Sequence, residues 1–265
     1  MTKRVSGDQK SQDELVELFA NANRVFVFTG AGVSKESGLP TFRDLDGEWT
    51  KYDPMTFATL DGFLQNPVMV WNMYRKRQKQ VAAAQPNPAH IVIAGMESYY
   101  PEFLLATQNV DDLHERAGSR KMVKIHGDSQ RVRCLDCGES RCASDFDLPD
   151  EFDNDTLPKC PECGSLCRPD IVWFGEYVPQ EPMFAAVNAA SRCDLMLIVG
   201  TSGEVSGGYG FAEYAMRRGA KIVEINPSEG ALTHYTHYWI AEPAGAALPP
   251  IWRLVAATHP RETSD

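Results

Sequence analysis

The sequence predicts an α/β protein built on a parallel, doubly wound β-sheet. Short apolar runs of strand length alternate along the chain with longer stretches of helical pattern. The first run, 24–29 (RVFVFT), leads straight into a glycine turn at 30–32, as a buried strand of a parallel sheet does. Two stretches, 46–87 and 131–168, break the alternation. We therefore expect a smaller domain inserted into the sheet domain.

The individual elements follow from these patterns. Strands are expected at 24–29, 103–107, 122–125, 195–199 and 221–225. Helices are expected between them, at 12–22, 89–99, 182–191 and 210–218. A further helix is predicted over 66–84, because Asn66-Pro67 pairs an N-cap residue with proline at the first helical position.

The domain limits follow from the same pattern of strands, helices and the two inserted stretches. Segments 1–47, 88–130 and 168–265 are expected to form the sheet domain. The helical module 48–87 and the cysteine-bearing module 131–167 are expected to form the small domain together.

Charge and hydropathy limit the partners. With 36 acidic and 26 basic residues, the net charge of −10 disfavours general binding to nucleic-acid backbones or anionic membranes. The longest apolar runs are far below the roughly 20 residues of a membrane helix, and no apolar run follows the first cations. We expect a monomeric, cytoplasmic protein with no membrane or sequence-specific nucleic-acid partner.

The cysteines predict a structural zinc ion. Seven is an odd number, and four of the cysteines form two C-x-x-C pairs, Cys134/Cys137 and Cys160/Cys163. This spacing is typical of tetrahedral zinc with a closed shell of four thiolates, in a reducing compartment. A redox pair is the less favoured reading, because neither pair opens a helix after a strand. The remaining cysteines, Cys142, Cys167 and Cys193, are expected to be free buried thiols, although Cys142 and Cys167 lie close enough in sequence to be substitute zinc ligands.

The glycine turn indicates a dinucleotide site of Rossmann-like type. Glycine lets the backbone approach a pyrophosphate, and the following helix N-terminus favours its charge. The motif Gly30-x-Gly32 lacks the third glycine and the acidic ribose-binding residue of the dehydrogenase fingerprint, however. Taken alone, it is equally compatible with an ordinary strand-to-helix turn.

Polar residues after two later strands face the same expected edge of the sheet. The run Gln108-Asn109-x-Asp111 directly follows one strand, and His126 follows the next. Helix capping by Asn109 or Asp111 is the alternative reading, and a single histidine is more often structural than catalytic. A histidine is nevertheless a suitable base near neutral pH.

Six segments spread along the chain resemble the sirtuin family of NAD-dependent protein lysine deacylases, in the same order. They are GAGVSKESGLPTFR (30–43), TQNVDDLH (107–114), HG (126–127), RPDIVWFGE (168–176), GTS (200–202) and INP (225–227). The resemblance implies that His126 is the catalytic base and that Asn109 and Asp111 act beside it in the nicotinamide and ribose pocket. The further NAD contacts that it implies are Gly30, Ala31, Gly32, Phe42, Arg43, Trp49, Gln108, Val110, Gly200, Thr201, Ser202, Asn226 and Ala244.

The resemblance also implies the reaction. The acyl oxygen of an acyl-lysine would attack the ribose carbon as nicotinamide leaves, and His126 would then activate a ribose hydroxyl. Free lysine, nicotinamide and O-acyl-ADP-ribose would be the products, so NAD is consumed. An acyl-lysine peptide would lie between the segment holding Val172, Phe174, Gly175 and Glu176 and the segment at Val205. There the chain departs from the family, with Ser206-Gly207-Gly208 where relatives often carry Tyr-Pro-Ala.

The segment 66–77 (NPVMVWNMYRKR) resembles the sirtuin class that prefers succinyl, malonyl and glutaryl lysine. Tyr74 and Arg77 are three residues apart and share one helix face. An arginine fork matches a carboxylate, and tyrosine adds a hydroxyl donor. The alternative is a solvated basic helix face, because Arg75, Lys76 and Lys79 are also cationic.

Two other functions remain open at this point. One is an ADP-ribosyltransferase that uses the same pocket to modify a protein side chain. The other is a non-enzymatic module with a zinc ribbon that binds NAD or nucleic acid, against which the acidic composition counts.

Overall fold

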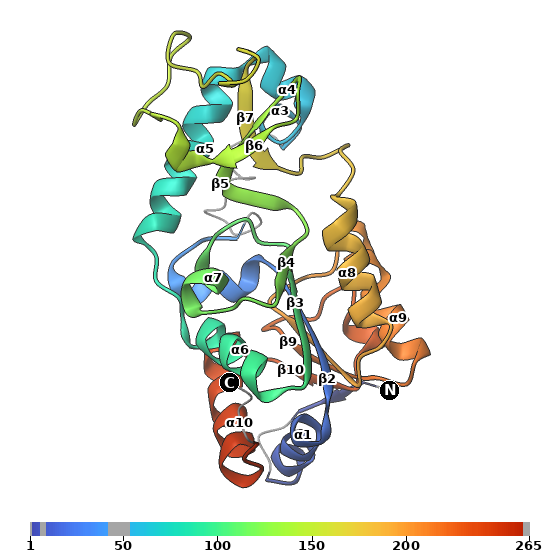
Figure 1. The fold of residues 1–265 in the computed structure, drawn as a ribbon. Coiled ribbons are helices and arrows are strands. Elements are labelled where there is room, and N and C mark those ends of the chain that lie inside the picture. The colour runs from blue at the N-terminus through green and yellow to red at the C-terminus, as the bar shows by residue number, and fades with distance from the viewer. Residues whose placement is uncertain (1, 6–8, 42–53, 262–265) are drawn as a thin grey trace.

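The computed structural model describes residues 2–5, 9–41 and 54–261, which contain two sheets (Figure 1). The large sheet has seven strands, all paired in parallel, in the order β1-β10-β9-β8-β2-β3-β4. Its strands are β1 Lys3–Arg4, β2 Arg24–Thr29, β3 Glu102–Thr107, β4 Met122–Lys124, β8 Leu195–Val199, β9 Lys221–Ile225 and β10 Tyr238–Ile240. The doubly wound parallel sheet expected from the sequence is confirmed.

Helices cover both faces of this sheet (Figure 1). One face packs on α1 Gln9–Asn21, α6 Pro88–Tyr99 and α10 Ala244–Thr258, and the other on α8 Gln180–Ala190 and α9 Phe211–Arg217. The central strand β2 shows why: Val25 and Val27 point into the first layer, while Phe26 and Phe28 point into the second. Burial on both faces explains the unbroken apolar run in the sequence.

A smaller lobe combines helices with a three-stranded antiparallel sheet (Figure 1). Its elements are α3 Pro54–Phe57, α4 Leu60–Gln65, α5 Pro67–Ala83, β5 Gly127–Cys134, β6 Ser140–Cys142 and β7 Cys167–Ile171. All of them except β6 contribute residues to one core around Phe63, Trp71 and Trp173. The Trp71 indole N–H donates to the carbonyl of Cys167 over 3.0 Å, which attaches α5 to β7. The limits of the two domains stay a prediction.

Some elements carry no clear pattern in the sequence. Strands β1 and β10 have two and three residues, too few to show any periodicity. Helix α10 contains Pro249 and Pro250 inside its span, where proline normally argues against a helix. Asn66 occupies the expected N-cap position of α5, but its side chain makes no capping hydrogen bond.

Short helical turns complete the described chain. They are α7 Leu113–Ala117 and the 3-10 turns η1 Ala31–Ser37, η2 Ala143–Asp145, η3 Val205–Gly210 and η4 Thr233–Tyr235. No helix in the described ranges is both long and apolar enough to cross a membrane.

The four cysteines of the two C-x-x-C pairs gather at one end of the small sheet. Their sulfur atoms all lie within 4.8 Å of one another. Cys134 Sγ and Cys163 Sγ are 3.5 Å apart, and Cys137 Sγ and Cys160 Sγ are 3.6 Å apart. Zinc–sulfur bonds of about 2.3 Å put tetrahedral sulfurs about 3.8 Å apart, so the cluster fits one structural zinc ion.

The three remaining cysteines lie outside the cluster. Cys167 and Cys193 are buried, and burial raises the pKa of each thiol to about 12. Cys142 is exposed, so the expectation that it is a buried thiol is wrong. It ends the short outer strand β6, whose other residues are only half-buried.

Replacing a cluster cysteine is expected to release the metal. Cys137→Ser should lower bound zinc well below the roughly one ion per chain of a closed four-thiolate site, because three thiolates leave a position open to water. Cys142→Ser is the matched control, since both cysteines are exposed. Metal analysis after dialysis measures the difference. Equal zinc in the two variants would contradict the assignment.

Candidate functional site

The loops after β2 and β8 meet backbone to backbone at the carboxyl edge of the large sheet. Gly30 N–H donates to the carbonyl of Val199, and Gly32 N–H to that of Gly200, over 3.1 and 2.8 Å. A Cβ on Gly32 would lie 2.7 Å from the Gly200 oxygen, and one on Gly30 would lie 2.7 Å from Thr201 Cβ. Both glycines are therefore required by the packing of the two loops.

The loop after β3 joins this junction through Gln108. The Thr201 hydroxyl donates to Gln108 Oε1 over 2.7 Å, and the Gln108 backbone N–H donates to the Thr29 carbonyl. Gln108 Nε2 is buried and finds no hydrogen-bond partner among the described residues. An amide donor left in this position suits a polar ligand, so the residues present fit the expected NAD.

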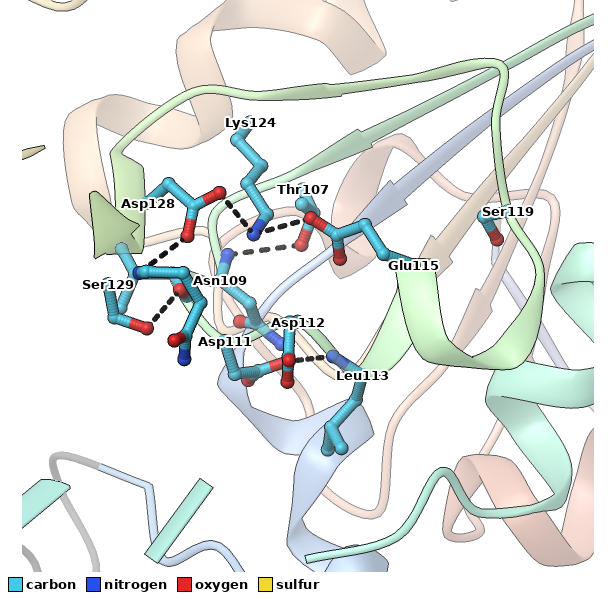
Figure 2. Close-up of polar contacts among 12 residues, drawn as sticks. Thr107, Asn109, Asp111, Asp112, Leu113, Glu115, Ser119, Lys124, Asp128 and Ser129 are labelled. Carbon is cyan, nitrogen blue, oxygen red and sulfur yellow. Dashed lines mark hydrogen bonds and ion pairs between the residues drawn. The ribbon is translucent and has the colours of Figure 1, made fainter. Parts of the chain in front are cut away.

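Asn109 and Asp111 are buried and converge on Ser34. Asn109 Nδ2 donates to Ser34 Oγ over 3.1 Å, and Ser34 Oγ donates to Asp111 Oδ2 over 3.1 Å. Asp111 Oδ1 also accepts from Leu113 N–H at the start of α7, whose N-cap residue is Asp112 and not Asp111 or Asn109 (Figure 2). Ser34 lies inside the 30–43 motif, which could have pointed to it.

The charge of Asp111 is set by opposing effects. Burial raises the pKa of its carboxyl, while the Leu113 N–H, the Ser34 hydroxyl and the charges of Lys124 and Arg77 lower it. Figure 2 shows Lys124 on β4 between two carboxylates, Glu115 at 2.5 Å and Asp128 at 3.1 Å. Lys124 thus links α7, which holds Glu115, to β5, which holds Asp128, and no motif in the sequence indicates it.

His126 follows β4 and lies at the same edge. Its Nδ1 is 3.0 Å from the carbonyl of Gln108, and its Nε2 is 2.5 Å from the hydroxyl of Tyr209. Burial lowers the pKa of the imidazole, and the Gln108 carbonyl opposes this shift. The His126 carbonyl accepts from Val172 N–H over 2.9 Å, which ties it to the segment after β7.

The residues expected at the adenosine end follow β8, β9 and β10. Asn226 Nδ2 donates to the Thr201 carbonyl over 3.4 Å, and Ser202 is the next residue along that loop. Ala244 begins α10, where the following N–H, of Gly245, donates to Glu36 on η1 over 2.6 Å. Asn226 thus contacts the loop after β8, and the start of α10 contacts η1, which follows the glycine turn.

The segment after β7 exposes Phe174 to solvent and turns Glu176 inward. Phe174 is 49% exposed, and its N–H donates to the Ala58 carbonyl. Glu176 is turned inward, where it accepts from Trp173 N–H and pairs with the buried Arg168. Gly175 has φ of +85°, a backbone conformation that favours glycine. Val205, on the opposite segment, begins η3.

Helix α5 directs its cations to different sides. Arg75 donates to the carbonyls of Leu148 and Pro149, and Lys79 pairs with Asp150. Arg77 instead donates to the carbonyl of Pro40 over 3.3 Å, and its charge acts on Asp111. Arg77 is therefore directed away from the contacts of Arg75 and Lys79 and is not part of one basic face with them.

Tyr74 lies one turn before Arg77 on α5. Its hydroxyl accepts from the Trp173 indole N–H over 2.8 Å. Burial raises the pKa of this hydroxyl to about 12, so it remains protonated.

Three of the expected NAD contacts, Phe42, Arg43 and Trp49, lie outside the described residues. The remaining ones lie on the loops that follow β2, β3, β8, β9 and β10. Lys124 and Tyr209 are additional residues of this region that the motifs do not indicate.

Comparison with known proteins identifies relatives across most of the chain. The profile of the Sir2 family matches residues 30–207. NAD-dependent protein deacylase 1 of Pseudomonas aeruginosa is 44% identical over 242 residues, covering 90% of this chain and 97% of that protein. NAD-dependent protein deacylase of Methylococcus capsulatus is 42% identical over 252 residues, covering 94% and 98%.

Solved structures give the same result. The crystal structure of a Sir2 homologue–NAD complex matches with a TM-score of 0.87 and 37% identity over 98% of each chain. Sir2 bound to an acetylated peptide matches with a TM-score of 0.80 and 27% identity over 91% of this chain and 97% of that one. With a family profile over more than half of its length and curated relatives at 42–44% identity, the chain belongs to the Sir2 family, the sirtuins.

Proposed function

We propose that the protein is an NAD-dependent protein lysine deacylase that transfers the acyl group of an acyl-lysine to ADP-ribose. The observation that supports this most is the meeting of His126, Asn109 and Asp111 around the Gln108 loop, at the edge where a doubly wound sheet binds its ligands. The relatives carry the name NAD-dependent protein deacylase. One of the matching structures holds NAD, and another holds an acetylated peptide.

In this proposal each side chain has one task. NAD supplies the ribose carbon that accepts the acyl oxygen as nicotinamide leaves. Asn109 and Asp111, fixed by their shared contact with Ser34, orient the nicotinamide and its ribose. His126 removes a proton from a ribose hydroxyl through Nε2, while its Nδ1–H on the Gln108 carbonyl steadies the imidazolium that forms.

The peptide is proposed to lie between the segment after β7 and the segment at Val205. Backbone groups of Val172, Phe174 and Gly175 would bind it as an added strand, and such binding tolerates varied sequences. The inward-turned Glu176 supports this arrangement, because its pairing with Arg168 shapes the segment.

We propose that the preferred acyl groups end in a carboxylate, as succinyl does. Tyr74 accepts from Trp173, so its own O–H proton can be donated to an acyl carboxylate. Arg77 lies on the same face of α5, and its charge reaches Asp111 in the nicotinamide pocket. A carboxylate that extends from the reacting acyl carbon toward α5 would meet both groups.

His126→Ala is expected to reduce kcat/KM for deacylation by roughly 10²- to 10⁴-fold, the usual contribution of a general base. Mass spectrometry of the peptide, together with nicotinamide release, measures the loss. His234→Ala is the control, because His234 is exposed. Full deacylation activity in His126→Ala would disprove the proposal that His126 is the general base. Transfer of labelled ADP-ribose to protein, without acyl-dependent nicotinamide release, would favour a transferase instead.

Arg77→Met is expected to lower kcat/KM for a succinyl-lysine peptide by roughly 10- to 100-fold, since a charge-assisted hydrogen bond contributes roughly 1.5–3 kcal/mol. Activity on the matching acetyl-lysine peptide should change little, because acetyl has no carboxylate. Arg75→Met is a matched control on the same helix, whose guanidinium faces Leu148 and Pro149. Equal losses of kcat/KM on both peptides would contradict the binding of the acyl carboxylate by Arg77 and indicate a structural role.

A further inference from the structure

Tyr209 has an unusual backbone conformation beside the site. Its φ is +58°, and among the described residues it is the only non-glycine residue with a positive φ. Gly208 and Gly210 on either side have φ of +62° and +70°. An L-residue in this region is disfavoured, and it persists only where its surroundings hold it there.

Ring packing holds Tyr209 in this conformation. Its ring lies 5.8 Å from that of Phe211 and 5.9 Å from that of His126, measured between centroids. Phe211 is fully buried and packs edge-on against Phe26 and Phe28 of the central strand. Packing against Phe211 thus places the ring beside His126 in the NAD-free enzyme, with its hydroxyl directed at Nε2.

The contact of Nδ1 determines which group donates in the hydrogen bond between Nε2 and the Tyr209 hydroxyl. The Gln108 carbonyl, 3.0 Å from Nδ1, can only accept, so Nδ1 carries the proton. Nε2 of the neutral ring is then an acceptor, and the Tyr209 hydroxyl, 2.5 Å away, donates to it. This is the tautomer in which Nε2 can act as a base.

We propose that Tyr209 is a positioning residue for His126: its hydroxyl holds the imidazole ready through Nε2 in the NAD-free enzyme and withdraws when the cofactor ribose hydroxyl takes that nitrogen. This inference rests on the proposed role of His126 as the base. A neutral imidazole has a single lone pair on Nε2, so the two hydroxyls cannot occupy it together. The glycines on both sides of Tyr209 give the backbone freedom to move.

The contact has a defined effect on protonation. A donor to Nε2 binds only the neutral ring, so removing it makes protonation easier and raises the pKa of His126 in the free enzyme. Within the described residues, burial and the Gln108 carbonyl are the other influences on this pKa, and no charged side chain contributes to it. Activity requires the neutral base and is lost as pH falls through the pKa.

Tyr209→Phe keeps the ring and removes the hydroxyl. In the variant, the acid limb of kcat/KM for NAD, which reports the free enzyme, should move to higher pH by about 0.5 to 1 unit. The acid limb of kcat, which reports the enzyme with NAD bound, should stay where it is, because Tyr209 has already withdrawn. Tyr214→Phe is the control, since Tyr214 is 38% exposed on α9. If neither acid limb moves in Tyr209→Phe, or if the acid limbs of kcat/KM and kcat move equally, the inference is overturned.

Nitrogen NMR of the His126 imidazole in the NAD-free protein tests the contact without turnover. We expect the Nδ1–H tautomer in the wild type and a higher pKa of His126 in Tyr209→Phe. The opposite tautomer, or the same pKa in both proteins, would overturn the inference even where His126→Ala abolishes deacylation. If deacylation instead proves independent of His126, the proposed base fails, while the titration still reports on Tyr209.

Discussion

The loops after β2 and β8 rest directly on each other, because Gly32 and Gly200 carry no side chain at their point of contact. This contact sets the distance between two loops that carry expected cofactor contacts. Gln108 attaches the loop after β3 to the same junction, and His126 attaches to Gln108 through its Nδ1. The two glycine loops thus position Gln108, and Gln108 positions His126. The backbone contact at the edge of the sheet therefore sets the geometry of the site.

The strands of the large sheet were predictable because burial on both faces leaves continuous apolar runs such as β2 and β8. Strands β1 and β10 were not, since two or three residues at a sheet edge have no periodicity. The cysteine spacing predicted a cluster that the fold assembles. Exposure is harder to read from sequence, as Cys142 shows: a residue at the end of an outer strand can face solvent whatever its type.

The motifs named many polar residues of the site but not how they contact one another. Ser34 joins Asn109 to Asp111 across 75 and 77 positions of the chain, and no local pattern reveals such a contact. Lys124 and Tyr209 lie outside the segments of family resemblance. Tyr209 contacts His126 because of a left-handed turn, which depends on packing against Phe211. Contacts set by tertiary packing are the part that sequence reasoning leaves out.

The hydrogen bond from Val172 N–H to the carbonyl of His126 joins the segment expected to hold the acyl-lysine to the residue that carries the imidazole. We infer that ordering of one segment on substrate binding would order the other, so that binding of the two proposed substrates would be thermodynamically linked. Such linkage is reciprocal: if peptide binding orders the imidazole and favours NAD, then NAD favours the peptide by the same factor. The two substrates of such an enzyme would bind with positive cooperativity through one backbone contact.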